Sequence, residues 1–412
     1  MSECPHNSCG ARSAAGFSLI ELLTAMALSL LMFALAFTLV QQLDNSADVV
    51  GSMADVNENL RAAVNMMSRD LSTAGQNIPV AGIPLPYGGT GTSAIKELYP
   101  SATNFPTPSG SSLYMPVLIA GNGLGPSQGS GGTAISTDVV TMIGVNQTSS
   151  FNPTTVNTTT SPPTITSSSA TITVSSTAAG YVSPGQLIML SNINSNCLLA
   201  ISSVNTTTGV ITFTHGDTTN DLLGVNQFSI LSTGAVAFAV TSGPTSGTFS
   251  FLQTATQTSS HGVTTTAYSW PTGLTAYPIS MVTYYLDSTT PERNLTKLTT
   301  MGTSGCAAVT CTNVVALGID VVQIFYNLFP AATLNGVTAD PTEDPWPTTS
   351  DTGNSPNHIR KVVIALIGET NHKNFANSQW CSKEIKSAVT IQNLDFSNQY
   401  GTSSSSTQMT QN

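Results

Sequence analysis

The longest apolar segment of the chain runs from Phe17 to Val40, FSLIELLTAMALSLLMFALAFTLV, and contains one charged residue, Glu21. As a helix rising 1.5 Å per residue it would be about 36 Å long, enough to cross a hydrocarbon core of about 30 Å. The segment is longer than the apolar region of a secretory signal peptide, and no A-x-A-like cleavage site follows it before the polar residues 41–46. The pattern therefore predicts a transmembrane helix over 17–40.

After this segment, apolar residues recur every three or four positions, which indicates that the helix continues with an amphipathic character. Gly75 and Pro79 mark its end, so we expect one helix over 17–76, roughly 87 Å long over 17–74. Its first half would face lipid or other subunits, and its second half would pack on a globular domain. A soluble coiled coil on a membrane anchor is the alternative. The recurring positions are Leu43, Ala47, Val50, Ala54, Leu60, Val64, Met67 and Leu71.

Beyond the helix the pattern predicts short β-strands separated by turn residues. The Pro/Gly-rich residues 77–135 are expected to form a long wrapped loop, residues 136–400 a β-rich head, and residues 401–412 a disordered tail. Within the head, residues from about 170 to 240 are expected to form an inserted small β-barrel-like part. The fold class is therefore α+β, a long N-terminal helix followed by an antiparallel β-rich head with Ser/Thr-rich loops. The expected strands are 138–145, 170–176, 186–191, 198–204, 210–214, 227–231, 235–240, 280–286, 317–326, 360–367 and 385–394.

Charge is scarce in this chain. Only 8% of the residues are charged, where about 25% is usual, and 11 Lys and Arg against 21 Asp and Glu leave a net charge of -10. The acidic balance argues against a protein that coats nucleic acid, and the 40% hydrophobic content argues against a wholly disordered chain. The composition is typical of an exported, β-rich surface protein.

Glu21 is the position in the apolar segment that most indicates function, because a carboxylate there costs on the order of 2.5–3.5 kcal/mol on insertion scales. If the chain were cut after Gly16, the new α-amino group of Phe17 could neutralise Glu21 of a neighbouring copy. The alternative is that Glu21 lies at the membrane edge and extends into the headgroups.

Residues 16–23, GFSLIELL, closely resemble the class III signal of type IV pilins and type II secretion pseudopilins. The resemblance implies that a membrane-embedded prepilin peptidase cuts after Gly16 and methylates Phe17, and that Glu21 guides assembly. The leader, residues 1–16, has fewer Lys and Arg residues than most members, and Thr38 stands where many major pilins have a proline that kinks the helix.

A weaker resemblance to PilW-type minor pilins and J-type pseudopilins lies in five further segments: 61–75 with its Arg-Asp pair, 138–140, 284–286, 318–326 and 389–393. It implies a structural subunit of a type IV pilus, without enzymatic activity or cofactor, that acts in pilus initiation at or near the tip. Its partners would be other pilins contacted through the helix, the prepilin peptidase and the inner-membrane assembly platform. The protein would lie in the inner membrane with its head in the periplasm, and later in the surface pilus. The alternatives are a J-type pseudopilin of type II secretion and a pilus-associated adhesin or DNA-uptake subunit.

Four cysteines follow the leader, and an even number in a periplasmic domain favours disulfides. Cys306 and Cys311 could close a short loop, which by elimination would leave Cys197 to pair with Cys381, although four cysteines allow three pairings. No zinc motif occurs. Asp340, Glu343 and Asp344 lie in a Pro-rich loop and are weak candidates for calcium ligands, with a solvated acidic loop as the more ordinary interpretation.

Overall fold

The computed structural model divides into two compact units, residues 1–54 with 370–381 and residues 55–369 with 382–412. The sites predicted at Gly16 and Phe17 lie outside the described residues, as does the tail at 401–412. The structure describes residues 18–78, 83–84, 114–115, 117–128, 135–145, 154–155, 169–192, 195–214, 217–223, 225–228, 254–260, 263–269, 275–287, 294–300, 310–328, 344–345, 359–373 and 380–391.

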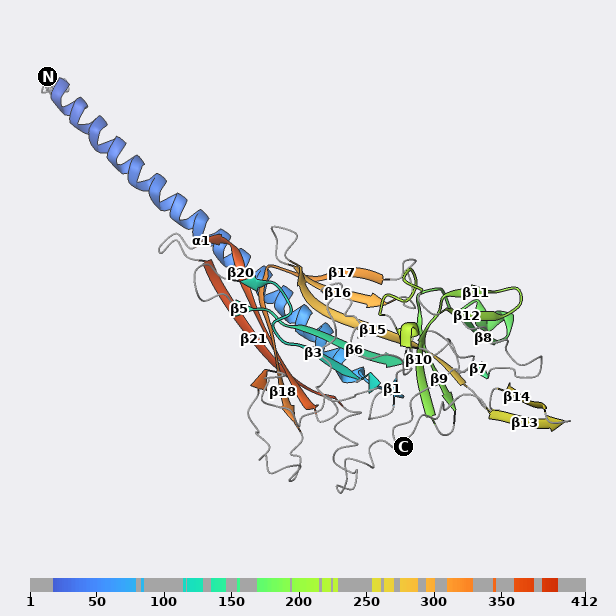
Figure 1. Cartoon of the computed structure of the whole chain (residues 1–412). Coiled ribbons are helices and arrows are strands. Elements are labelled where there is room, and N and C mark those ends of the chain that lie inside the picture. The colour runs from blue at the N-terminus through green and yellow to red at the C-terminus, as the bar shows by residue number, and fades with distance from the viewer. Residues whose placement is uncertain are drawn as a thin grey trace, which may run out of the picture. The chain divides into compact units, whose positions relative to one another are not determined.

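The predicted long helix is present as α1 (Leu19–Thr73), drawn in blue in Figure 1. It contains no proline and one glycine, Gly51, so no residue interrupts the backbone ladder strongly. It ends where expected, because Gly75 adopts a φ of 73° that favours glycine. The side chains that α1 buries are spaced by three or four residues, as an amphipathic helix requires. They are Val56, Leu60, Ala63, Val64, Met67 and Leu71.

The largest sheet has eight antiparallel strands, with β15 at its centre. Different stretches of β15 pair with β9, β6 and β16, so one strand joins segments that are far apart in the sequence. The strands are β3 (Leu118–Gly121), β6 (Val139–Val145), β7 (Thr154–Thr155), β9 (Leu187–Asn192), β10 (Ser195–Ala200), β15 (Thr275–Asp287), β16 (Asn294–Thr300) and β17 (Thr310–Leu317).

A second antiparallel sheet has the order β19-β18-β20-β21. Its strands are β18 (Ile319–Leu328), β19 (Asp344–Pro345), β20 (Ile359–Lys373) and β21 (Trp380–Thr390). In the unit that begins at Asp55, buried residues of α1 share one hydrophobic core with both sheets, including Leu60, Met281 and Ile324. Burial of this helix face against strands provides the driving force that the isolated amphipathic helix lacks.

A smaller three-stranded sheet, β11-β12-β8, occupies the region predicted to be barrel-like. It has its own core, which β9 and β10 line through alternate residues: Leu187 and Met189 belong to the main core, and Ile188 and Leu190 to the second. The predicted barrel-like part also includes residues outside the described ones, so it stays a prediction; the described strands there form a three-stranded sheet. The elements are β8 (Ser169–Thr173), α2 (Ser176–Ala179), β11 (Ser203–Asn205) and β12 (Val210–Thr214).

Two further predictions differ from the structure. Residues 77–135 were expected to be a loop, but β3 within them pairs with β6 in the large sheet. Residues 227–231 were expected to be a strand, but the described part belongs to η1 (Val225–Phe228), a 3₁₀ helix. The predicted strand 235–240 lies outside the described residues. The remaining short strands are β1 (Ile83–Pro84), β2 (Tyr114–Met115), β4 (Ser127–Gln128), β5 (Ile135–Ser136), β13 (Thr254–Ser260) and β14 (Val263–Ser269).

Candidate functional site

The first half of α1 is an exposed apolar surface. Among the described residues, α1 is the one helix that is long and apolar enough to cross a membrane, and its most apolar stretch has no buried residue. Leu22, Phe33 and Phe37 have exposed fractions of 56%, 63% and 68%. Such a surface is unfavourable in water, so it is compatible with a membrane anchor.

Glu21 lies in the first turn of this exposed helix. The backbone N–H of Ser18 donates a hydrogen bond to Glu21 Oε2 at 3.3 Å, which is one half of a capping box. The carboxylate therefore pairs with one of the free N–H groups at the start of the helix, where the helix dipole also favours negative charge.

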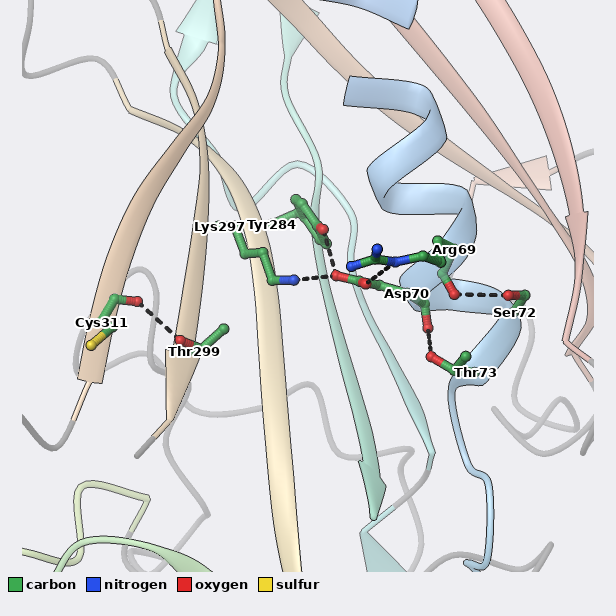
Figure 2. Close-up of polar contacts among 8 residues, drawn as sticks. All are labelled: Arg69, Asp70, Ser72, Thr73, Tyr284, Lys297, Thr299 and Cys311. Carbon is green, nitrogen blue, oxygen red and sulfur yellow. Dashed lines mark hydrogen bonds and ion pairs between the residues drawn. The ribbon is translucent and has the colours of Figure 1, made fainter. Parts of the chain in front are cut away.

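The second feature is a polar junction at the other end of α1, where Asp70 meets the large sheet (Figure 2). Tyr284 Oη, from β15, donates a hydrogen bond to Asp70 Oδ2 at 2.7 Å, and Lys297 Nζ, from β16, forms an ion pair with the same oxygen. The Lys297 ammonium also lies 5.7 Å from the centre of the Tyr284 ring. The Asp70 and Lys297 side chains are only 14% and 18% exposed. The junction thus ties the helix to two strands more than 200 residues away in the sequence.

Burial is the main reason why the pKa of Tyr284 is raised far above its usual value, and the charge of Asp70 and the hydrogen bond to it add to the effect. The phenol therefore stays protonated and remains a donor to the carboxylate. Arg69, the other half of the Arg-Asp pair, is 77% exposed and lies 3.8 Å from Asp70. Its exposure makes it a weak contributor.

The turn after Asp70 is also tied to the large sheet. The N–H of Gly75 donates to the carbonyl of Ile143 in β6 at 2.8 Å. The hydroxyls of Ser72 and Thr73 donate to the carbonyls of Arg69 and Asp70 in the last turn of the helix. Local side chains and the sheet together therefore fix where the helix ends.

Asp138 makes a comparable connection between the two large sheets. Its Oδ1 accepts from Gly123 N and its Oδ2 from Ile324 N, both at 2.8 Å. Its own N–H donates to the carbonyl of Val322 at 2.9 Å. Asp138 is 5% exposed, and burial raises the pKa of its carboxyl, although the two backbone hydrogen bonds act in the opposite direction.

The segments that carry the weaker resemblance therefore meet in one structural unit. Asp70 contacts Tyr284, Asp138 contacts the strand that contains Ile324, and Val389 and Ile391 are buried in the same core. Sequence reasoning missed Lys297. Its signal was a single lysine in the otherwise uncharged run NLTKLTT, but nothing in the sequence indicated its partner.

The cysteines only partly match expectation. Cys311 is disulfide-bonded, and its predicted partner Cys306 lies outside the described residues, so that pairing stays a prediction. Cys381 is a free, half-buried cysteine, so the predicted pair of Cys197 with Cys381 is wrong. Count and spacing alone could not determine which cysteines face each other.

The described residues contain no group of three His, Cys, Asp or Glu residues that could hold a metal ion. Asp340 and Glu343 lie outside those residues. Asp344 begins β19, where it is paired with Tyr326 of β18. The suggestion of calcium binding at these three acids thus stays untested.

The polar junction leads to a first prediction. Replacing Tyr284 with phenylalanine removes one hydrogen bond to a carboxylate, so we expect the free energy of unfolding to fall by about 1.5 to 3 kcal/mol. Denaturant unfolding of the full chain in detergent, followed by circular dichroism, measures this change. Tyr277→Phe, at a half-buried position on the same strand, is the matched control and should have a clearly smaller effect. Equal effects would show that the hydrogen bond with Asp70 does not stabilise the junction.

A scan against protein-family models, a search of curated proteins and a search of solved structures each found no match. The functional interpretation therefore depends on the residues quoted above and on the two features of α1. One is an exposed apolar half with an acidic residue in its first turn, and the other is a half that is packed and tied to a β-rich unit.

Proposed function

We propose that this chain is a minor pilin of the PilW type, a structural subunit that initiates or assembles a type IV pilus at or near its tip. In this proposal it is inserted in the inner membrane by α1, cut between Gly16 and Phe17, and incorporated into the filament through contacts between helices. Its head would lie in the periplasm and then at the cell surface.

The observation that carries the proposal is the exposed apolar half of a helix whose other half is packed in a β-rich unit. Large side chains from Leu19 to Leu43 are at least half exposed, and lipid or similar helices would remove them from water. When the subunit leaves the bilayer and enters the filament, these side chains move from lipid to the apolar surfaces of other helices. In the proposed filament the contacts between helices are head-to-tail, and such contacts generate an open helical assembly when the rotation between subunits does not close into a ring.

Glu21 supports the same proposal through charge. Within a bilayer its carboxylate favours a cationic partner, and the α-amino group of a cut chain at Phe17 supplies one from a neighbouring subunit. The capping contact with Ser18 holds the carboxylate at the end of the helix, where a neighbouring N-terminus can reach it.

A second prediction concerns this residue. Glu21→Ala should be cut normally, because the cleavage site is unchanged, but should enter filaments roughly tenfold less, since the charge that attracts the neighbour is lost. Quantitative immunoblots of membranes and sheared filaments measure both steps. Thr24→Ala, one turn further along the helix, is the control and should enter filaments normally. Wild-type amounts of Glu21→Ala in filaments would contradict the assigned role.

The proposal as a whole is tested by N-terminal peptide mass spectrometry of the protein from membranes and from sheared filaments. We expect a chain that begins at N-methylated Phe17 in both fractions. An uncut chain confined to membranes would instead indicate an anchored surface protein that does not enter a filament.

A further inference from the structure

We propose that residues 43–58 of α1 bind a helix of a different subunit, which carries Lys or Arg where it lies beside these residues. The acidic residues within 43–58 would exclude a second copy of this chain. The inference rests on the function proposed above, and it names the chemistry of the partner. We call Leu43, Ala47, Val50 and Ala54 the outer stripe.

The outer stripe is exposed, whereas another side of the same stretch of helix is partly covered. Leu43 and Val50 are 61% and 66% exposed. Val49 and Met53, by contrast, are half-buried. At about 100° per residue, Val49 and Met53 lie roughly 130° and 90° around the helix from the centre of the outer stripe. The apolar outer stripe is thus a separate face without a described partner in its own unit.

Its spacing favours another helix as the occupant. Steps of four, three and four residues from Leu43 to Ala54 repeat the a and d positions of a heptad, through which two helices interlock. Gly51 lies beside the stripe with no atom within 4 Å of where its Cβ would be, so a neighbouring helix can approach closely there.

Lipid does not fit as the occupant. In the proposed topology the apolar span ends near Val40, and Val50 lies about 15 Å further along the helix, beyond the hydrocarbon. Asp44 and Asp48 follow the span directly and are exposed, and a carboxylate is unfavourable in hydrocarbon.

The charges determine which kind of helix fits. Residues 18–60 contain five acidic residues and no Lys or Arg, and Asp44 and Glu58 occupy the positions flanking the seam that select partners in coiled coils. Two copies in register would bring the acidic residues of both helices close together, with no Lys or Arg between residues 18 and 60 of either helix to neutralise them. Bringing Arg61 of one copy to Asp44 of the other requires a shift of about 26 Å, which would lift one apolar span out of the bilayer. A different helix with basic residues at this level has neither problem.

The test introduces a photo-crosslinking amino acid at Val50 of the full-length protein in cells that assemble the filament. The same amino acid at Asn45, exposed on a side about 140° away, is the control for position, and at Leu31 it reports contacts within the apolar span. We expect Val50, but not Asn45, to give an adduct whose crosslinked peptide comes from a different subunit and contains Lys or Arg.

Charge reversal tests the selection. Asp44→Lys with Asp48→Lys should lower the Val50 adduct at least roughly tenfold while the Leu31 adduct remains, and Glu384→Lys on β21 should leave both unchanged. Co-expressing wild-type and charge-reversed copies should create an adduct between copies, because their helices are then complementary.

Three results would each overturn the inference and leave the proposed function intact. They are a Val50 adduct with a second wild-type copy, a Val50 adduct whose yield does not change on charge reversal, and no Val50 adduct when Leu31 gives one. Loss of both adducts together with an uncut N-terminus would instead overturn the proposed function, and the inference with it.

Discussion

Replacing Asp138 with alanine is expected to lower the free energy of unfolding by about 2 to 5 kcal/mol, because the buried N–H of Ile324 and the partly buried hydrogen bond of Gly123 both lose their acceptor. Asp138→Asn keeps one acceptor oxygen and turns its amide toward the other N–H, so we expect a loss of about 1 to 3 kcal/mol. Asp138→Ala should therefore have a lower free energy of unfolding than Asp138→Asn, and this order tests the role of the two hydrogen bonds as directly as the size of either loss.

The measurement is guanidinium unfolding of the full chain in detergent, with hydrogen exchange of peptides covering 117–128 and 319–328. Exchange should increase in these two segments together, since Asp138 connects them. Asp48→Ala, at an exposed position on α1, is the control and should change the free energy of unfolding by less than about 0.5 kcal/mol. Faster exchange in only one segment would contradict a connecting role.

The same residue gives a pH dependence. Because burial raises the folded-state pKa of Asp138, its carboxyl favours folding below its unfolded-state pKa of about 4, and this contribution is lost as pH rises through the folded-state pKa. The deficit of Asp138→Ala relative to the wild type should therefore be largest in acid and shrink as pH rises from about 4. A deficit that grows over that range would contradict the raised pKa.

Gly209→Ala is expected to destabilise the three-stranded sheet by about 2 to 5 kcal/mol, from left-handed backbone strain and overpacking together. Gly209 has a φ of 71°, and an added Cβ would lie 2.0 Å from the carbonyl oxygen of Val174. The carbonyl of Gly209 also accepts from Val174 N at 2.8 Å, so moving the backbone away breaks the link between β8 and β12.

Gly51→Ala is the matched control for this substitution, because no atom lies within 4 Å of its added Cβ and it sits inside a helix. Alanine there should stabilise α1 by about 1 kcal/mol. Hydrogen exchange resolved by peptide distinguishes the two effects: faster exchange in β8, β11 and β12 for Gly209→Ala, and no such change for Gly51→Ala. Unchanged exchange in these strands would show that the turn can accommodate a Cβ.

The sequence predicted the elements better than their partners. Periodicity predicted α1 to within two residues at its start, and Gly75 predicted its end, because helix hydrogen bonds and the glycine preference are local. β12 matched its predicted bounds of 210–214. The short strands among the Pro/Gly-rich residues were missed because pairing with β6 or β2, and not their own composition, makes them strands.

At the polar junction the sequence indicated some of the residues but not their contacts, for a related reason. The Arg-Asp pair and Tyr284 were recognisable as sequence features, but the contact of Asp70 with Lys297 spans 227 positions and depends on how β15 and β16 pair. The free state of Cys381 has the same origin, because disulfide bonding depends on where two side chains meet.

The sequence by itself determined that this protein has one long helix with an apolar first half, an acidic residue in its first turn and a β-rich remainder low in charge. These properties follow from the composition and from hydrophobic repeats of two residues in strands and 3.6 residues in helices. Both can be recognised within short segments of the sequence. Only the tertiary structure decided that Asp70 and Asp138 act as links, that β11, β12 and β8 pair in one sheet, and that the outer stripe is exposed. These outcomes depend on burial and on pairings between distant segments, which are properties of the folded chain and not of any window within it.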